Sequence, residues 1–255
     1  MDELNHADRS ELDFVGRCAI VSGGSSGIGL ATALRLARLG AGVVVLDLQP
    51  PVMDVSGAGV RYVHADVTCR EAVPKAFDEA EVHLSAPADL LVVSAGRYTL
   101  GAILELTEET WLATNQLNVM GALFALQEFR RRLPDDMVAS SVLLSSAATA
   151  HANTAEPYAA YAATKAAVVA LARQAAAEWA PSVRVNVVSP GLIKTPMLKI
   201  DQDQQALDAY LEDRVPVRRV GTAEEVASVI TFLLSSAASY VTGADVPVDG
   251  GLIIT

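Results

Sequence analysis

Ser22-Gly-Gly-Ser-Ser-Gly-Ile-Gly29 joins a short apolar run, Cys18–Ser22, to a segment with helical periodicity, Gly27–Leu39. A glycine-rich turn between a strand and a helix presents backbone N–H groups and the positive end of the helix dipole, where a pyrophosphate can bind. Side chains at the spaced glycines would block close approach of the phosphate, or of the helix to the strand. The predicted phosphate-binding residues are Gly23, Ser25, Ser26, Gly27, Ile28 and Gly29. Because a glycine cluster alone can also be a simple tight turn, the surrounding elements decide its meaning.

Apolar runs and longer helical segments alternate along the whole chain. The predicted strands are Cys18–Ser22, Val43–Leu48, Val60–His64, Leu90–Ser94, Val138–Ser145, Val183–Val188 and Val246–Val248. The predicted helices are Gly27–Leu39, Ala72–Leu84, Glu108–Leu133, Tyr158–Trp179 and Ala223–Leu234. Strands this apolar are covered on both faces, and helical crossovers make them parallel. We therefore predict an α/β fold, a doubly wound parallel sheet of the Rossmann type with helices on both faces.

One domain, residues 15–255, accommodates these elements, because no second core or internal repeat is visible. Residues 1–14 mix charged and apolar side chains without an apolar core, so we expect a flexible tail that is neither a signal peptide nor an anchor. Residues 192–217 form a polar segment with Pro196 and Pro216 near its ends, which predicts a small helical flap over the substrate.

Composition narrows the class of protein. The formal net charge of −11 would repel a phosphate backbone, and only the short run Arg130-Arg131-Arg132 opposes it, so nucleic acid is not expected as a partner. The two cysteines, Cys18 and Cys69, belong to no cluster that binds metal, and they fit a reducing cytoplasm. No apolar stretch reaches the roughly 20 residues that span a bilayer. We predict a cytoplasmic protein without metal or membrane partner.

Asp47 ends the second predicted strand. A carboxylate at this position accepts hydrogen bonds from both ribose hydroxyls of a dinucleotide but repels a 2′-phosphate. Neither Ser26 in the glycine loop nor Leu48 after the aspartate supplies a base that would hold that phosphate. The predicted cofactor is therefore NAD rather than NADP.

Tyr161 and Lys165 are four residues apart on an alanine-rich helix, so their side chains share one face. A phenol with its ordinary pKa of about 10 needs roughly 4 kcal/mol of phenolate stabilisation to reach a pKa of about 7. A positive charge at about 4 Å supplies an energy of that order when the effective dielectric is about 20. Tyr158 competes for this role, but the residue four positions later is Ala162, which carries no charge. A tyrosine and a lysine at this spacing on a helix are usually only neighbours on the surface, so the pair indicates catalysis only together with the other motifs.

The spacing Gly-x-x-x-Gly-x-Gly, the acidic residue after the second strand and the Tyr-x-x-x-Lys pair resemble the short-chain dehydrogenase/reductase family, nearly end to end. The resemblance implies a nicotinamide dinucleotide cofactor and an alcohol or ketone substrate. Further segments that look like the family's cofactor contacts and carboxyl-terminal signature are Asp66-Val67, Ser94-Ala95-Gly96, Pro190-Gly191 with Ile193 and Thr195, and Asp249-Gly250-Gly251. The chain departs from the family at Val93 and Ser94, which replace paired asparagines, so the amide that usually braces the central strand is missing.

The resemblance also implies roles for individual residues. Tyr161 is the base that takes the hydroxyl proton, and Lys165 supports it and binds the nicotinamide ribose. Ser146, which follows the strand Val138–Ser145, orients the reacting oxygen. Asn118 supports a water that leads protons from the lysine to solvent; a buried asparagine bonded to backbone is its structural alternative. The segment between Ser146 and Tyr161 is slightly longer than usual in the family.

Substrate identity does not follow from these motifs. The candidate substrate residues are Tyr98, His151, Asn153, Glu156 and Tyr158. The polar set within them favours a hydroxylated substrate such as a sugar, polyol or diol. Three alternatives stay open: an NADP(H)-dependent ketone or 3-oxoacyl reductase, a methyltransferase, and a dinucleotide-sensing protein without turnover. The resemblance further implies a homotetramer.

Overall fold

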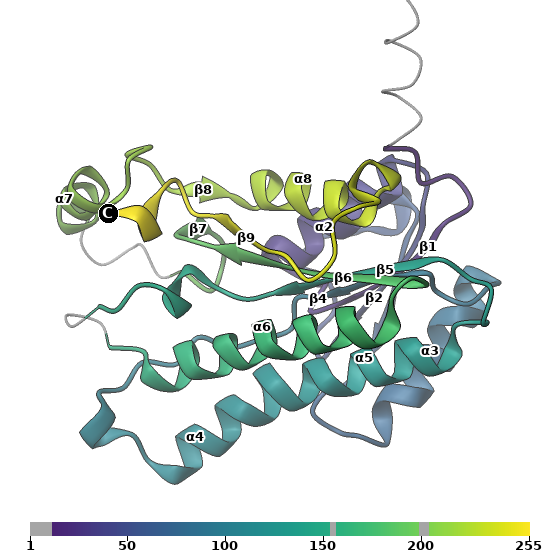
Figure 1. Ribbon diagram of the computed structural model, residues 1–255, viewed down its shortest axis with the longest axis horizontal. Coiled ribbons are helices and arrows are strands. Elements are labelled where there is room, and N and C mark those ends of the chain that lie inside the picture. Colours follow the sequence, from purple (N-terminus) through teal and green to yellow (C-terminus); the bar gives the residue numbers. More distant parts are fainter. Residues whose placement is uncertain (1–11, 154–156, 199–203) are drawn as a thin grey trace, which may run out of the picture.

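The computed structural model describes residues 12–153, 157–198 and 204–255. Its central sheet has seven parallel strands in the order β3-β2-β1-β4-β5-β6-β9 (Figure 1). The strands are β1 Cys18–Ser22, β2 Gly42–Asp47, β3 Val60–His64, β4 Leu90–Val93, β5 Ala139–Leu144, β6 Val183–Pro190 and β9 Asp245–Val248. The strand order reverses between the neighbours β1 and β4, which opens a crevice at their carboxyl ends. The predicted doubly wound parallel sheet is confirmed.

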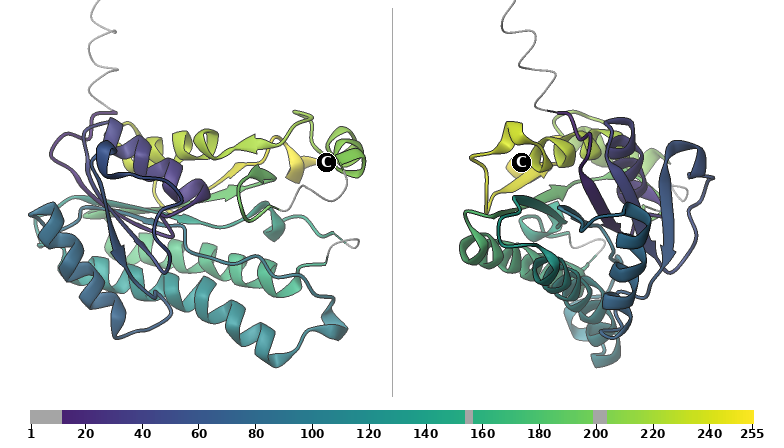
Figure 2. Two further views of the ribbon diagram at one scale, coloured as in Figure 1. Left: turned by 180° about the vertical axis from the view of Figure 1, so that it is seen from behind. Right: turned by 90° about the vertical axis from the view of Figure 1, so that its right-hand side faces the viewer.

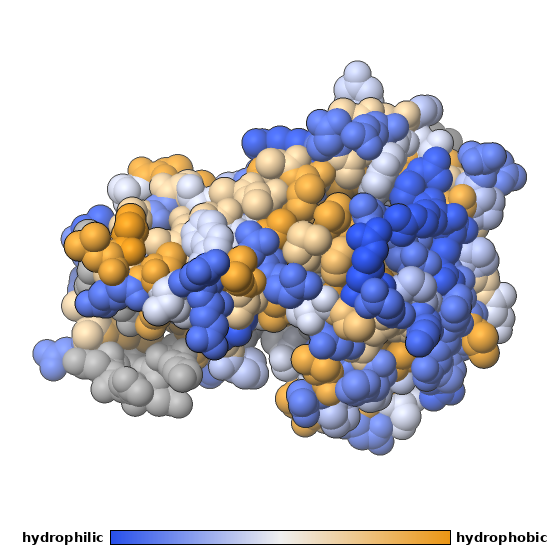
Figure 3. Space-filling view, turned by 90° about the horizontal axis from the view of Figure 1, so that it is seen from below, coloured by the Kyte–Doolittle hydropathy of each residue, from blue (hydrophilic) through white to orange (hydrophobic). Residues whose placement is uncertain are grey.

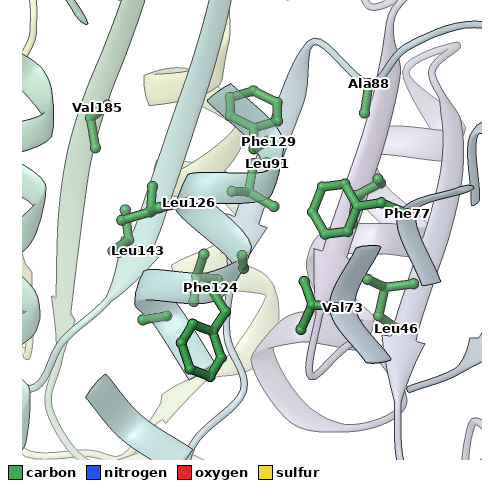
Figure 4. Packing of buried hydrophobic residues seen from close by; sticks show 14 of the residues in the cluster. Leu46, Val73, Phe77, Ala88, Leu91, Phe124, Leu126, Phe129, Leu143 and Val185 are labelled. Atoms are coloured by element: carbon green, nitrogen blue, oxygen red, sulfur yellow. The ribbon is translucent and has the colours of Figure 1, made fainter. Parts of the chain in front are cut away.

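Helices cover both faces of the sheet (Figures 1 and 2). One face carries α2, Gly27–Arg38, and α8, Ala223–Leu234; the other carries α3, Ala72–Leu84, α5, Gly121–Arg132, and α6, Ala159–Trp179. Adjacent strand residues therefore enter different cores: Ile20 packs with Phe77 and Phe129 beneath the sheet, whereas Val21 packs with Leu36 above it. Figure 4 shows the lower core, where side chains of α3 and α5 meet those of the strands.

The prediction of one continuous helix over Glu108–Leu133 is wrong. This segment consists of α4, Glu108–Asn115, a π-helical turn, Gln116–Met120, and then α5. The wider turn lies around Asn118, whose buried side chain is hydrogen-bonded to other segments of the chain. Single wide turns inside α-helices occur often at functional sites.

The boundary of the predicted tail also needs correction. Phe14 is fully buried in the upper core, and its N–H donates to the carbonyl oxygen of Leu39 at 3.0 Å. Burying a phenylalanine contributes roughly 1.5–3 kcal/mol. Phe14 therefore belongs to the packed structure, and the rest of the predicted tail up to residue 11 lies outside the described residues.

The predicted flap contains α7, Gln204–Arg214, between the short paired strands β7, Ile193–Lys194, and β8, Gly221–Thr222. Leu211 and Val215 pack against Leu252 of the carboxyl-terminal turn, and this turn lies beside α7 in Figure 2. Further contacts hold the two segments together: the Thr255 hydroxyl donates to the Arg214 carbonyl at 3.0 Å, and the Val217 N–H to the Gly250 carbonyl at 3.1 Å.

Hydrophobic side chains gather on the surface at the end of the molecule that carries α4 (Figure 3). The exposed residues of this region are Leu100, Ile103, Leu104, Trp111 and Leu112. They belong to α4 and to the loop before it, which also carries Tyr98. Among the helices of the described residues, none is long and apolar enough to cross a bilayer.

Candidate active site

The glycine loop fits a phosphate group, because close backbone contacts leave no room for side chains. A Cβ added at Gly29 would lie 2.1 Å from the Gly23 carbonyl oxygen, and one at Gly23 would lie 2.5 Å from the Ala95 nitrogen. Gly27 has φ +53°, and its Cβ position is 3.3 Å from Cγ2 of Thr195. Ser26 is the N-cap of α2, so the helix begins within the loop. The predicted loop residues thus form a narrow cradle at the positive end of a helix.

Asp47 stands beside this cradle at the end of β2. Its carboxylate accepts hydrogen bonds from the Ser25 and Gln49 N–H groups, each at 3.2 Å. The Ser25 hydroxyl donates to the Gln49 carbonyl at 2.6 Å, which ties the loop to the segment after β2. Leu48 is exposed and carries no charge. The acidic group is therefore held where the ribose of a dinucleotide binds in this kind of fold.

Other predicted cofactor residues line the same edge of the sheet. The Ser94 N–H donates to the Ser22 carbonyl at 2.9 Å, which brings Ser94-Ala95-Gly96 against the glycine loop. Asp66 accepts from the Thr68 N–H at 2.8 Å, and Val67 is buried beside Gly121. The amide missing at Val93 and Ser94 has no replacement among these contacts.

The segment after β6 closes the edge from the other side. The Gly191 N–H donates to the Val248 carbonyl at 3.1 Å, and a Cβ added at Gly191 would lie 2.8 Å from Cα of Asp249. Ile193 is buried, and Thr195 reaches Gly27. Thr195 is therefore brought close to the cradle, whereas Gly191 packs against the carboxyl-terminal signature at Asp249.

Tyr161, Lys165 and Ser146 meet at the carboxyl end of β5. Tyr161 and Lys165 are buried, with Nζ of Lys165 5.9 Å from the centre of the Tyr161 ring. The ammonium group donates to the carbonyl oxygen of Leu144 at 2.8 Å. The Ser146 side chain interacts with the Tyr161 phenol and lowers its pKa, whereas the Ser145 hydroxyl donates to the Lys165 carbonyl at 3.0 Å. Ser145 thus holds the helix, and Ser146 is the serine that faces the phenol.

The electrostatics of the pair correct one expectation. Burial raises the pKa of the Tyr161 phenol above its ordinary value, and the hydrogen bond with Ser146 opposes this only in part. Burial also lowers the pKa of Lys165 to about 8. The spacing of the two residues predicted a lowered phenol pKa, and this prediction is wrong for the protein without cofactor. The free energy of removing a phenolate from water exceeds the stabilisation that the neighbouring groups provide.

Comparison with known proteins assigns the chain. The sequence model of the family described as Enoyl-(Acyl carrier protein) reductase matches residues 23–253. Galactitol 2-dehydrogenase (L-tagatose-forming) of Cereibacter sphaeroides is 37% identical, over 94% of this chain and 96% of its own. The 3-oxoacyl-[acyl-carrier-protein] reductase MabA of Mycobacterium tuberculosis is 37% identical over 94% of each chain. The chain belongs to the short-chain dehydrogenase/reductase family.

A solved structure agrees with this assignment. The aldohexose dehydrogenase of Thermoplasma acidophilum, in ligand-free form, superimposes with a TM-score of 0.87 at 28% identity over 96% of each chain. Members of the short-chain dehydrogenase/reductase family are oxidoreductases that use NAD or NADP, and the predicted family membership is confirmed.

Asn118 joins two segments of the site. Its Oδ1 accepts from the Arg97 N–H at 2.8 Å, and its Nδ2 donates to the Arg97 carbonyl at 3.1 Å and to the Thr164 hydroxyl at 2.9 Å. Asn118 is thus a buried asparagine bonded to backbone, which was the structural alternative to a functional role. Its role in supporting a water stays a prediction. Sequence analysis missed Thr164 and Arg97; their only signal was adjacency to Lys165 and Gly96.

Two of the predicted substrate residues, Tyr98 and Tyr158, lie near Tyr161. The Tyr158 hydroxyl donates to the His151 carbonyl at 2.8 Å and lies 3.1 Å from Nδ1 of the same residue. The ring of Tyr98 packs against those of Tyr158 and Tyr161, with ring centres 6.1 Å and 5.0 Å away. Asn153 belongs to the same loop, and Glu156 lies outside the described residues.

One side chain of the predicted flap, Tyr210, interacts with this group of tyrosines. Burial raises the pKa of Tyr158, and electrostatic interaction with Tyr210 of α7 and with Tyr161 raises it further. Tyr210 also packs in the cluster that contains Ala147, the residue after Ser146. Tyr210 of α7 thus lies near Tyr158 and Ala147, and the covering role of the flap stays a prediction.

Proposed function

We propose that this protein is an NAD(H)-dependent oxidoreductase that interconverts a secondary alcohol and its ketone. The observation that carries the proposal is the junction of Tyr161, Lys165 and Ser146 beside a cradle that only glycine can form. Neither feature would suffice alone, since glycine turns and tyrosine–lysine pairs both occur for structural reasons. Their meeting at one edge of a parallel sheet supports hydride-transfer chemistry.

The chemistry follows from the environment of the phenol. When bound, the nicotinamide accepts the hydride in oxidation or supplies it in reduction. Tyr161 takes the hydroxyl proton in oxidation and returns it to the ketone oxygen in reduction, while Ser146 orients that oxygen. Because the pKa of Tyr161 is raised, the phenol is protonated at neutral pH and ready to act as an acid. Oxidation needs the phenolate, so its rate rises as pH increases.

Asp47 supports NAD as the cofactor. We expect a kcat/KM for NAD at least about 100-fold above that for NADP, because a carboxylate fixed beside the ribose repels a 2′-phosphate. Asp47→Ala should narrow this ratio at least about tenfold, mainly through the KM values. Asp54→Ala, which changes an exposed acid on the following loop, serves as control. A wild-type preference for NADP would contradict the assignment and favour the reductase alternative, consistent with the equal similarity to MabA.

We infer a hydroxylated substrate such as a sugar alcohol, polyol or diol. The hydrogen-bonded pair His151 and Tyr158 supports this, as does the similarity to a galactitol dehydrogenase. We expect kcat/KM for galactitol or glycerol to exceed that for long-chain and steroid alcohols at least about tenfold, because an apolar substrate would remove from water the hydrogen-bonding capacity that His151 and Tyr158 keep beyond their mutual contacts. An NAD-linked assay over this panel measures it, and equal or better rates on the apolar alcohols would refute the inference.

The dinucleotide-sensing alternative makes a different prediction for the same assay. Such a protein would quench its fluorescence on binding NADH but turn over no member of the panel. We also infer a homotetramer, as the family resemblance suggests, because α6 presents the exposed small residues Ala163, Ala166 and Ala170 in one row that allows close helix contact.

A further inference from the structure

Tyr98 makes the closest ring contact of Tyr161 among the described residues. The two ring centres are 5.0 Å apart with an interplanar angle of 79°, an edge-to-face arrangement. Aromatic pairs prefer this geometry because the positive edge of one ring meets the negative face of the other. The same Tyr161 ring lies 5.9 Å from the ammonium group of Lys165. The phenol is therefore bounded by an aromatic ring and by a charge.

The backbone that carries Tyr98 is held in place, although it belongs to a loop. Asn118 bonds both the N–H and the carbonyl of the preceding residue, Arg97. The following residue, Thr99, shares a hydrogen bond of 3.0 Å with Thr114 of α4, whose hydroxyl is within 2.7 Å of the Thr110 carbonyl. Loop side chains are usually more mobile than those of helices. Here hydrogen bonds on both sides of Tyr98 fix where its ring lies.

The same asparagine also holds the helix that carries Tyr161. Nδ2 of Asn118 donates to the Thr164 hydroxyl at 2.9 Å, and that hydroxyl donates to the Tyr161 carbonyl at 2.8 Å. The contacts thus form a closed circuit: Asn118 holds the loop, the loop presents Tyr98, Tyr98 packs on Tyr161, and Thr164 joins the backbone of Tyr161 to Asn118. Such a circuit fixes the distance between the two rings from both ends.

We propose that Tyr98 is a positioning residue, which holds the Tyr161 ring in its reactive orientation and keeps water away from it. The proposal rests on the role of Tyr161 proposed above. A tyrosine side chain turns about two bonds, so a missing neighbour allows the hydroxyl to leave the substrate oxygen. A displacement of about 1 Å at a reacting group costs roughly 100-fold in rate. The hydroxyl of Tyr98 is not needed for this role, because the packing involves the ring.

Two substitutions separate the ring from the hydroxyl. Tyr98→Leu removes the aromatic contact and should lower kcat at least about tenfold, with KM for NAD within about twofold of the wild type. Tyr98→Phe keeps the ring, so its kcat should lie within about twofold of the wild-type value. Leu104→Ala, a fully exposed position on the same loop, serves as control. Steady-state oxidation kinetics and NADH fluorescence titrations measure these values.

The pH profile gives a readout that a merely structural role would not move. Burial is the main cause of the raised pKa of Tyr161. Removing the Tyr98 ring admits water, which stabilises the phenolate and lowers this pKa. The rise of kcat with pH in oxidation should therefore occur at lower pH in Tyr98→Leu than in the wild type and in Tyr98→Phe.

Three outcomes would overturn the proposal. An unchanged kcat and pH profile in Tyr98→Leu would show that Tyr161 keeps its orientation without Tyr98. If Tyr98→Phe raised the KM for the alcohol as much as Tyr98→Leu does, and neither variant changed kcat, the Tyr98 hydroxyl would be a substrate contact instead. A leucine variant that binds no NADH is replaced by Tyr98→Met, which keeps an apolar side chain of similar length; full kcat in that variant would also refute the role. Turnover retained in Tyr161→Phe would refute the proposed function itself, so the two failures are distinguishable.

Discussion

Tyr161→Phe is expected to lower kcat for oxidation and reduction by about 1,000-fold, while the affinity for NADH stays within about threefold of the wild type. The substitution removes the proton acceptor, and acid–base groups contribute roughly 10²–10⁴-fold to such reactions. The phenyl ring keeps its contact with Tyr98, so the packing is preserved. Stopped-flow measurement of hydride transfer, together with an NADH fluorescence titration, tests the two expectations separately.

Tyr240→Phe is the matched control for this experiment, because its ring is fully exposed and remote from the site in sequence. It should leave all kinetic constants unchanged. Should Tyr161→Phe turn over substrate at a rate near that of Tyr240→Phe, proton transfer does not pass through Tyr161, and the mechanism is wrong. A loss of NADH binding would instead indicate that the phenol hydroxyl supports the fold of the site.

Gly29→Ala is expected to weaken NADH binding at least about 100-fold. The added methyl carbon would lie 2.1 Å from the Gly23 carbonyl oxygen, so α2 has to move away from the loop. Movement of the helix displaces the N–H groups and the positive helix end that would meet the pyrophosphate. Isothermal titration with NADH and thermal unfolding measure the affinity and any accompanying loss of stability.

Gly57→Ala provides the comparison, since an added Cβ at that exposed position meets nothing within 4 Å. Its affinity for NADH should equal that of the wild type. If Gly29→Ala bound NADH within about threefold of Gly57→Ala, the loop would not be the phosphate site. If Gly29→Ala without cofactor had a lower melting temperature than the wild type, the same close contact would also contribute to the stability of the fold.

Much of the sheet was predictable, because most of its strands are short, mainly apolar runs that alternate with helical segments. Cys18–Ser22 and Val60–His64 match their predicted bounds, although Val60–His64 is an edge strand in which buried Val60 and Val63 alternate with exposed polar residues. The π-helical turn Gln116–Met120 was not predictable, because it depends on hydrogen bonds from Asn118 to residues far away in sequence. Periodicity reports which face of a helix is buried, and it does not report a single wider turn.

The candidate site divides in the same way. Four-residue spacing on a helix predicted that Tyr161 and Lys165 approach one another, and they do. The raised pKa of Tyr161 was not predictable, because it follows from burial by segments that the spacing does not describe. Tyr210 was predicted only as one residue of the flap, because nothing in the composition of residues 192–217 indicates which of its side chains interacts with Tyr158.

The contact between the carboxyl-terminal turn and α7 has a practical consequence for handling the protein. The Thr255 hydroxyl donates to the Arg214 carbonyl, and Leu252 packs against Leu211, so peptide appended after Thr255 would start beside α7. A purification tag fused there would compete with α7 for space. The kinetic constants measured for the alcohol would then depend on the tag as well as on the enzyme. The amino-terminal side is the safer point of attachment, because Phe14 bonds Leu39 at the carboxyl end of α2, the end opposite to the glycine loop.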